Sequence, residues 1–223
     1  MQKVLAFDVY GTLIDTQGVV MQLTEMVGQP AVAFAKTWRE KQLEYSFRRG
    51  LMQNYQPFSV CTAQALDYTC RVFNILLTDQ QKQQLLEGYK TLPAFADAAS
   101  ALTALKRDGH RLFAFSNGAY DAVEQLLTSA HIRDLFDGVI SVDDLKSFKP
   151  NPGVYSHFLR ETASTSDRAW LISGNPFDVI GAVSFGMSAA WVKRTPEAVF
   201  DPWGIEPTLT VSGLDELSPR LSG

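Results

Sequence analysis

The chain of 223 residues has little cysteine, no excess of basic residues and no long hydrophobic run. Its two cysteines, Cys61 and Cys70, form no CxxC pair, which excludes a disulfide scaffold and a four-cysteine zinc site, so we expect reduced thiols. Lys and Arg number 20 against 24 Asp and Glu, and the concentrated basic field of a nucleic-acid surface is therefore missing. No apolar stretch reaches the roughly 20 residues that a membrane span needs.

The beginning of the chain does not resemble a secretory signal. Residues 1–8 read MQKVLAFD, in which a short apolar run is broken by Asp8. The apolar fraction of 46% is ordinary for a globular protein. We therefore expect a cytoplasmic protein that binds neither nucleic acid nor membrane.

Short apolar runs alternate with helical patterns from residue 95 onward, beginning with a predicted helix at Phe95–Arg107. The apolar runs lack polar alternation, which is typical of strands covered on both faces. This order predicts βαβ units and an α/β fold with a parallel, Rossmann-like sheet. The predicted strands are Val4–Phe7, Arg111–Phe115, Gly138–Val142, Trp170–Ile172 and Ala189–Val192.

Residues 15–93 break this rhythm, because they contain no convincing strand. Their helical patterns cover Gln17–Val27, Pro30–Arg49, Ser59–Phe73 and Asp79–Tyr89. The pattern predicts a helical cap subdomain, residues 15–93, inserted into an α/β core domain of residues 1–14 and 94–223.

Arg39 has an unusual place in the second of these helices. On a helical wheel it falls within about 60° of Val32, Ala35 and Leu43, inside an apolar stripe. It is either a side chain that extends to solvent at the stripe's edge or an anion ligand aimed at a cleft. The opposite side of the helix is also apolar, with Phe34, Trp38 and Tyr45, so the helix needs two partners, one of which could be a second subunit.

Polar side chains follow four of the predicted strands. Because ligands bind at the carboxyl ends of strands in an open parallel sheet, these side chains could converge on one point. Each alone could be a helix cap or a surface residue. They are Asp8 and Thr12 after the first strand, Ser116 and Asn117 after the second, Lys149 after the third, and Ser173, Asn175 and Asp178 after the fourth.

These runs resemble the motifs of the haloacid dehalogenase superfamily. The first motif is FDVYGTL at residues 7–13, followed by FSNG at 115–118, Lys149-Pro150, and SGNPFD at 173–178. The resemblance extends to WREKQLEY at residues 38–45 of the insert and, more narrowly, is to the L-2-haloacid dehalogenases of type II.

Two features favour dehalogenation over phosphoryl transfer. Phosphatases of the superfamily resemble one another in having a second aspartate two residues after the nucleophile, and Tyr10 stands there in this chain. A halide leaves without a proton, whereas an alkoxide needs one. The fourth motif also lacks the early aspartate that helps hold Mg²⁺, so we expect neither a metal nor another cofactor. A Mg²⁺-dependent phosphatase and a non-catalytic member of the fold remain the alternatives.

The resemblance implies that Asp8 attacks C2 of a short 2-haloalkanoate, of the L enantiomer, and forms an ester that water hydrolyses. Ser116 would then bind the substrate carboxylate, and Arg39 and Asn117 would hold the departing halide. Thr12 would hydrogen-bond Asp8, and Lys149 would keep it ionised. Asp178, supported by Ser173, Asn175 and Tyr155, would act on the water. An apolar wall would consist of Tyr10, Leu43, Phe58 and Phe177.

Two positions depart from the usual pattern of the family. Phe177 replaces a tryptophan, and Glu40 replaces a glutamine and adds a negative charge near the halide site if it points inward. The resemblance and the second apolar face around Trp38 also suggest a homodimer. We expect Trp191 and Trp203 to be packing residues.

Overall fold

The computed structural model describes residues 2–221. Its centre is a parallel sheet of six strands in the order β3-β2-β1-β4-β5-β6, which confirms the predicted α/β class. The five predicted strands are all present, with ends that differ by at most one residue, and the short β6 was missed. The strands are β1 (Val4–Phe7), β2 (Arg111–Ser116), β3 (Gly138–Ser141), β4 (Ala169–Ser173), β5 (Ser188–Val192) and β6 (Leu209–Val211).

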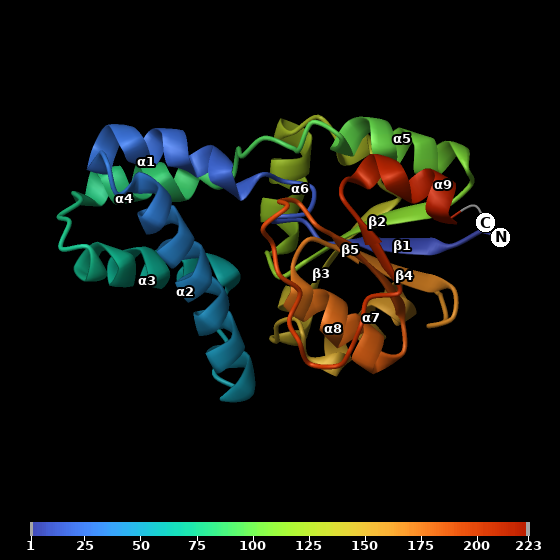
Figure 1. The fold of residues 1–223 in the computed structure, drawn as a ribbon. Coiled ribbons are helices and arrows are strands. Elements are labelled where there is room, and N and C mark those ends of the chain that lie inside the picture. Colours follow the sequence, from blue (N-terminus) through green and yellow to red (C-terminus); the bar gives the residue numbers. More distant parts are fainter. Residues whose placement is uncertain (1, 222–223) are drawn as a thin grey trace.

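Helices cover both faces of the sheet, as the uninterrupted apolar strands require. Alternate residues of β1 belong to two separate cores: Leu5 and Phe7 face one side, and Val4 and Ala6 face the other. In Figure 1, α5 and α9 lie on one side of the sheet, and α7 and α8 on the other. These elements are α5 (Ala98–Arg107), α6 (Tyr120–Ser129), α7 (Pro152–Glu161), α8 (Pro176–Phe185), α9 (Leu217–Leu221) and the 3-10 turns Arg133–Leu135, Val142–Leu145 and Leu214–Glu216.

A second group of helices stands beside the sheet as a separate lobe (Figure 1). It contains the 3-10 turn Thr16–Gly18 and the helices α1 (Val19–Val27), α2 (Ala31–Leu51), α3 (Phe58–Val72) and α4 (Asp79–Gly88). Two chain segments join the lobe to the core side by side, because Asp15 N donates to the carbonyl of Pro93, and Phe95 N to that of Leu13. No strand lies between residues 15 and 93, in agreement with the helical reading of this interval.

The faces of α2 differ from the expected ones. Val32 is 65% exposed, so it does not belong to a buried stripe with Ala35. Phe34 and Trp38 are fully buried, and the Trp38 indole donates to the carbonyl of Thr62 in α3 at 2.9 Å. This face is therefore covered by the lobe's own helices and offers no surface to a second subunit.

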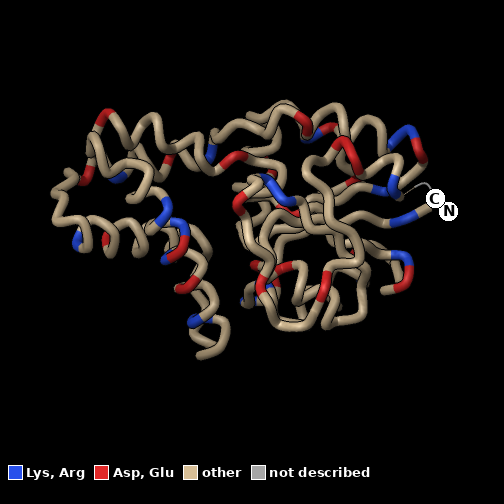
Figure 2. Tube along the Cα trace, viewed as in Figure 1, with Lys and Arg blue, Asp and Glu red and all other residues tan. Residues whose placement is uncertain are grey.

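Figure 2 shows acidic and basic residues interspersed over both lobes. Within residues 2–221, no helix combines the length and the apolar character required to cross a bilayer. Both cysteines are buried in α3 and free. Trp191 is buried as expected, whereas Trp203 is 71% exposed, so its assignment as a packing residue was wrong: it lies in an irregular segment between β5 and β6.

Candidate active site

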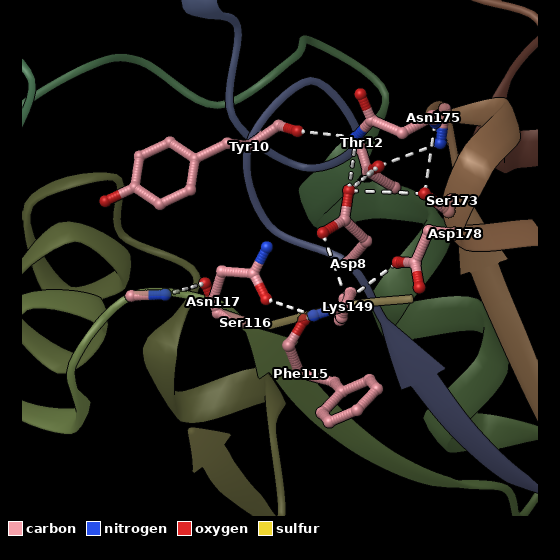
Figure 3. A network of polar contacts seen from close by, with 12 residues as sticks. Asp8, Tyr10, Thr12, Phe115, Ser116, Asn117, Lys149, Ser173, Asn175 and Asp178 are labelled. Atoms are coloured by element: carbon pink, nitrogen blue, oxygen red, sulfur yellow. Dashed lines mark hydrogen bonds and ion pairs between the residues drawn. The ribbon is translucent and has the colours of Figure 1, made fainter. Parts of the chain in front are cut away.

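The carboxyl ends of β1, β2 and β4 bring the sequence-predicted polar residues together (Figure 3). Asp8 directly follows β1, the central strand between β2 and β4. Ser116 and Ser173 are the last residues of those two neighbours. The parallel register therefore places side chains from three distant parts of the sequence at one edge of the sheet.

The two carboxylate oxygens of Asp8 have different surroundings. Oδ2 accepts hydrogen bonds from Thr12 Oγ1 at 2.7 Å, Asn175 Nδ2 at 2.7 Å and Ser173 Oγ at 3.2 Å. Oδ1 faces Lys149 Nζ at 3.2 Å, its one hydrogen-bond partner within residues 2–221. One oxygen is thus saturated with donors, while the other keeps a lone pair free for bond formation.

A close approach of two loops supports this arrangement. Gly174 N donates to Thr12 Oγ1 at 2.8 Å, and a Cβ at Gly174 would lie 2.4 Å from the carbonyl oxygen of Gly11. Real Cβ contacts of that length do not occur, so glycine is required at position 174 for the loops after β1 and β4 to meet.

Lys149 carries the positive charge at the centre of the site, and its side chain is 1% exposed. Its ammonium donates to Asp178 Oδ2 at 2.7 Å, to the carbonyl of Phe115 at 2.8 Å and to Asp8 Oδ1 at 3.2 Å, which uses all three donors. Burial disfavours this charge, but Asp178 and Asp8 outweigh burial and raise the pKa of the ammonium. Asn117 Oδ1 fixes the lysine by accepting from its backbone N–H at 2.9 Å.

Asp178 lies in the first turn of α8 and is completely buried. Burial raises the pKa of its carboxyl to about 6, against the opposing effect of Lys149. Tyr155 of α7 donates its hydroxyl to Asp178 Oδ1 at 2.8 Å, as expected. The expected support from Ser173 and Asn175 was wrong: both donate to Asp8, because they precede α8 and face the loop after β1, whereas Asp178 turns toward α7.

The helical lobe contributes Arg39 to this region. Its guanidinium donates to the carbonyl of Tyr10 at 3.3 Å and to Gln42 Oε1 at 2.7 Å, so it reaches from α2 to the loop after β1. Arg39 is thus a side chain that contacts the core, whereas Val32 of the expected stripe is exposed. Glu40, which differs from the usual residue of the family, is exposed to solvent. Its Oε1 lies 3.9 Å from Lys36 Nζ.

Aromatic side chains from both lobes surround the same loop. The rings of Tyr10 and Phe58 are 6.2 Å apart, and burial raises the pKa of the Tyr10 hydroxyl to about 12. The ring centroids of Phe177 and Phe47 are 4.9 Å apart, and Phe47 was not predicted from the sequence. Leu43 is half-buried on α2. A cavity of about 260 Å³ borders Tyr10 and Phe58 and is also lined by Gln42, Thr62, Leu86, Gly118 and Ala122.

Two predicted site residues have structural partners of their own. Ser116 Oγ accepts from Gly118 N at 3.1 Å, which bends the chain after β2 and leaves the hydroxyl proton free to donate. Asn117 uses its carbonyl on Lys149, and its Nδ2 has no hydrogen-bond partner within residues 2–221. Arg194, which was not predicted from the sequence, donates to the carbonyl of Thr12; its position two residues after β5 was the available signal.

The donor set is poor for a divalent cation. Within residues 2–221, no three His, Cys, Asp or Glu side chains are grouped as metal ligands. Between Asp8 and Asp178, the two carboxylates of the site, lies the ammonium of Lys149, which repels a cation.

Comparisons with known proteins place this geometry in a family. The model of the haloacid dehalogenase-like hydrolases matches residues 2–186. An (S)-2-haloacid dehalogenase of Pseudomonas putida is 36% identical over 214 residues, which are 96% of this chain and 94% of that protein. Haloacetate dehalogenase H-2 of Moraxella sp. (strain B) is 34% identical over 219 residues, 97% of each chain.

A solved structure agrees with these relatives. The L-2-haloacid dehalogenase of Xanthobacter autotrophicus with chloropropionic acid covalently bound superposes on this chain with a TM-score of 0.93 at 31% identity. The match covers 100% of this chain and 99% of that chain. The fold and the site define a hydrolase with an aspartate at the end of its first strand. The chain belongs to the haloacid dehalogenase-like hydrolases and, within them, to the (S)-2-haloacid dehalogenase family.

Proposed function

We propose that the protein hydrolyses short-chain 2-haloalkanoates, of the L enantiomer, to 2-hydroxyacids through an ester on Asp8. The observation that carries this proposal is the asymmetry of the Asp8 carboxylate: Oδ2 has three donors, whereas Oδ1 has Lys149 alone among the described residues 2–221. The names of the relatives, which include a haloacetate dehalogenase, and the covalently bound chloropropionic acid in the Xanthobacter structure support the substrate class.

In the first step, Asp8 Oδ1 attacks C2 in line with the carbon–halogen bond. A C–O bond forms, the carbon–halogen bond breaks, and the halide leaves with the electron pair, which inverts C2. Arg39 and the free Nδ2 of Asn117 are the donors for the halide. The hydroxyl of Ser116 and neighbouring backbone N–H groups hold the substrate carboxylate.

In the second step, water attacks the carbonyl carbon of the Asp8 ester. Asp178, flanked by Lys149 and Tyr155, takes the proton from that water. Negative charge then develops on Oδ2, and Thr12, Ser173 and Asn175 are already placed to donate to it. Collapse of the intermediate releases the 2-hydroxyacid and restores the carboxylate.

An apolar wall excludes bulk water from this reaction. Tyr10, Phe58, Leu43 and Phe177 are its members, and the aromatic contacts of Tyr10 with Phe58 support it. A water-poor site strengthens the electrostatic interactions inside it. We assign residues 15–93 the role of a cap on this site, because Arg39, Leu43 and Phe58 come from that interval.

The phosphatase alternative needs a proton donor two residues after Asp8. The hydroxyl of Tyr10 has a pKa of about 12, which makes it a weak acid for this purpose. The protein is further proposed to work in the cytoplasm, a setting that suits the two free cysteines Cys61 and Cys70. A homodimer is also proposed, from the family resemblance alone, since the face of α2 around Trp38 is covered by the lobe's own helices.

The test is halide release from chloroacetate, 2-chloropropionate and fluoroacetate in the presence of EDTA, with p-nitrophenyl phosphate plus Mg²⁺ as the comparison. We expect halide release without metal, and Asp8→Asn abolishes it. In a single turnover in ¹⁸O-water, the label enters Asp8 and not the product. Label that appears directly in the product would mean that water attacks C2, and phosphate release that depends on Mg²⁺ would favour the phosphatase.

A further inference from the structure

Gln42 of α2 is a buried polar side chain whose function the reaction above does not use. It is 1% exposed, and buried polar side chains are as a rule hydrogen-bonded. It lies one helical turn after Arg39, on the side of α2 that packs against α3. Its residue type and position in the sequence predict no role for it.

The hydrogen bonds of Gln42 run in one direction. Arg39 Nη1 donates to Gln42 Oε1 at 2.7 Å, Gln42 Nε2 donates to Thr62 Oγ1 at 2.5 Å, and Thr62 donates to the carbonyl of Phe58 at 2.9 Å. A guanidinium has no acceptor, so the glutamine must present its oxygen to Arg39 and its amide nitrogen to Thr62. The chain of donors therefore ends on the backbone of α3 and has a single orientation.

The effect on Arg39 is geometric. Arginine loses much side-chain freedom when it is fixed, and a single bond to the Tyr10 carbonyl at 3.3 Å leaves rotation about that contact open. The second bond, to Gln42, fixes the plane of the guanidinium. The donors that remain on it then point in a constant direction.

We propose that Gln42 is a positioning residue that aims the Arg39 guanidinium at the departing halide, with Thr62 as its anchor on α3. This inference rests on the proposed function, because it assigns Gln42 to the halide-binding arm of that reaction. Gln42 itself touches neither the nucleophile nor the catalytic water, since its partners are Arg39 and Thr62.

If Gln42 aims Arg39, the rate lost by a Gln42 variant should depend on which halide leaves. Chloride is a poorer leaving group than bromide, so its departure depends more on well-aimed donors in the transition state. A variant that misaims Arg39 therefore loses more rate with the chloride than with the bromide. A variant that only reduces the amount of folded protein lowers both rates by the same factor.

The experiment measures single-turnover halide release and steady-state kcat and KM for 2-chloropropionate and 2-bromopropionate. Gln42→Met keeps the length of the side chain and removes both hydrogen bonds. We expect its chloride-release rate to fall about tenfold, less than the roughly 10²–10³-fold typical of losing a donor outright. The ratio of bromide to chloride rates should rise about threefold, with kcat changed more than KM.

Two further variants make the test independent of one substitution. Thr62→Val keeps the shape and removes the anchor of Gln42, and it should raise the same ratio by a smaller factor. Ser46→Ala is the matched control, because Ser46 is also buried on α2 but donates to the carbonyl of Leu43, away from Arg39. Its ratio of bromide to chloride rates should equal that of the unaltered protein.

Equal losses with both substrates in Gln42→Met and Thr62→Val, or no loss at all, would overturn the positioning role. So would a change in the ratio for Ser46→Ala. If the unaltered protein releases no halide from either substrate, the proposed function fails first and this inference fails with it.

Discussion

Replacing Lys149 by Met should move a proton onto Asp178 at neutral pH. The ammonium is the one cation that contacts both buried carboxylates within residues 2–221, at 3.2 Å from Asp8 and 2.7 Å from Asp178. Without it the two negative charges face each other in a water-poor site, so one carboxyl becomes neutral. Asp178 takes the proton, because Asp8 keeps three donors, while the side chain of Asp178 keeps one donor, Tyr155, in the part of the chain that the structure describes.

The magnitude follows from the pKa of Asp178, which burial raises from 3.8 to about 6 even with Lys149 present. While the folded pKa lies above the unfolded one, the folded state binds more protons in the interval between them. The free energy of unfolding therefore falls as pH rises, by about 1.4 kcal/mol per pH unit. In the unaltered protein that interval ends near pH 6, and in Lys149→Met it extends upward. Between pH 6 and 8 the variant should lose stability relative to the unaltered protein, by at most about 2.7 kcal/mol.

The assay is denaturant unfolding of both proteins at pH 6, 7 and 8, with a halide burst measured alongside. A protonated Asp178 cannot accept a proton from water, whereas Asp8 can still attack the substrate. Lys149→Met should thus release at most one equivalent of halide per site and then stop with the ester in place. Parallel stability curves for the two proteins, or sustained turnover by the variant at pH 7, would refute this reasoning.

Two further predictions follow from buried groups. Turnover of the unaltered protein should fall about tenfold per pH unit below pH 6, because the Asp178 carboxyl with a pKa of about 6 must be ionised to act as a base; a flat pH–rate profile from pH 5 to 8 would contradict this. Trp38→Phe should lower the free energy of unfolding by about 1–3 kcal/mol in denaturant titrations, because it leaves a cavity and removes the indole hydrogen bond to the Thr62 carbonyl. An unchanged denaturant midpoint would contradict this, because it would mean that the helices of the lobe repack and fill the cavity left by the indole.

The strands and the strand-end residues were predictable because both depend on local pattern. Val4–Phe7 is an apolar run covered on two faces, and the parallel register then fixes where Asp8 and Ser173 lie. β6 was not predictable in the same way. Its three residues carry no periodicity of their own, and Leu209 and Val211 become a strand by pairing with β5.

Side-chain partners across elements were harder to predict. Ser173, Asn175 and Asp178 are neighbours in sequence, yet the first two serve Asp8 and the third faces Lys149 and Tyr155. A strand-to-helix turn separates their directions within five residues, and no sequence period reports this. The exposed Val32 has a similar cause, since packing of α2 against α3 selects the Trp38 face for burial.

The different partners of the two carboxylates argue for a division of labour within one small site. Asp8 has donors that hold one oxygen and leave the other open, an arrangement that suits a nucleophile and later stabilises charge on the held oxygen. Asp178 is buried, and burial raises the pKa of its carboxyl to about 6, which suits a base that must take a proton near neutral pH. Lys149 lies between them and satisfies both, so a single ammonium does what a bound cation would otherwise have to do for two adjacent negative charges.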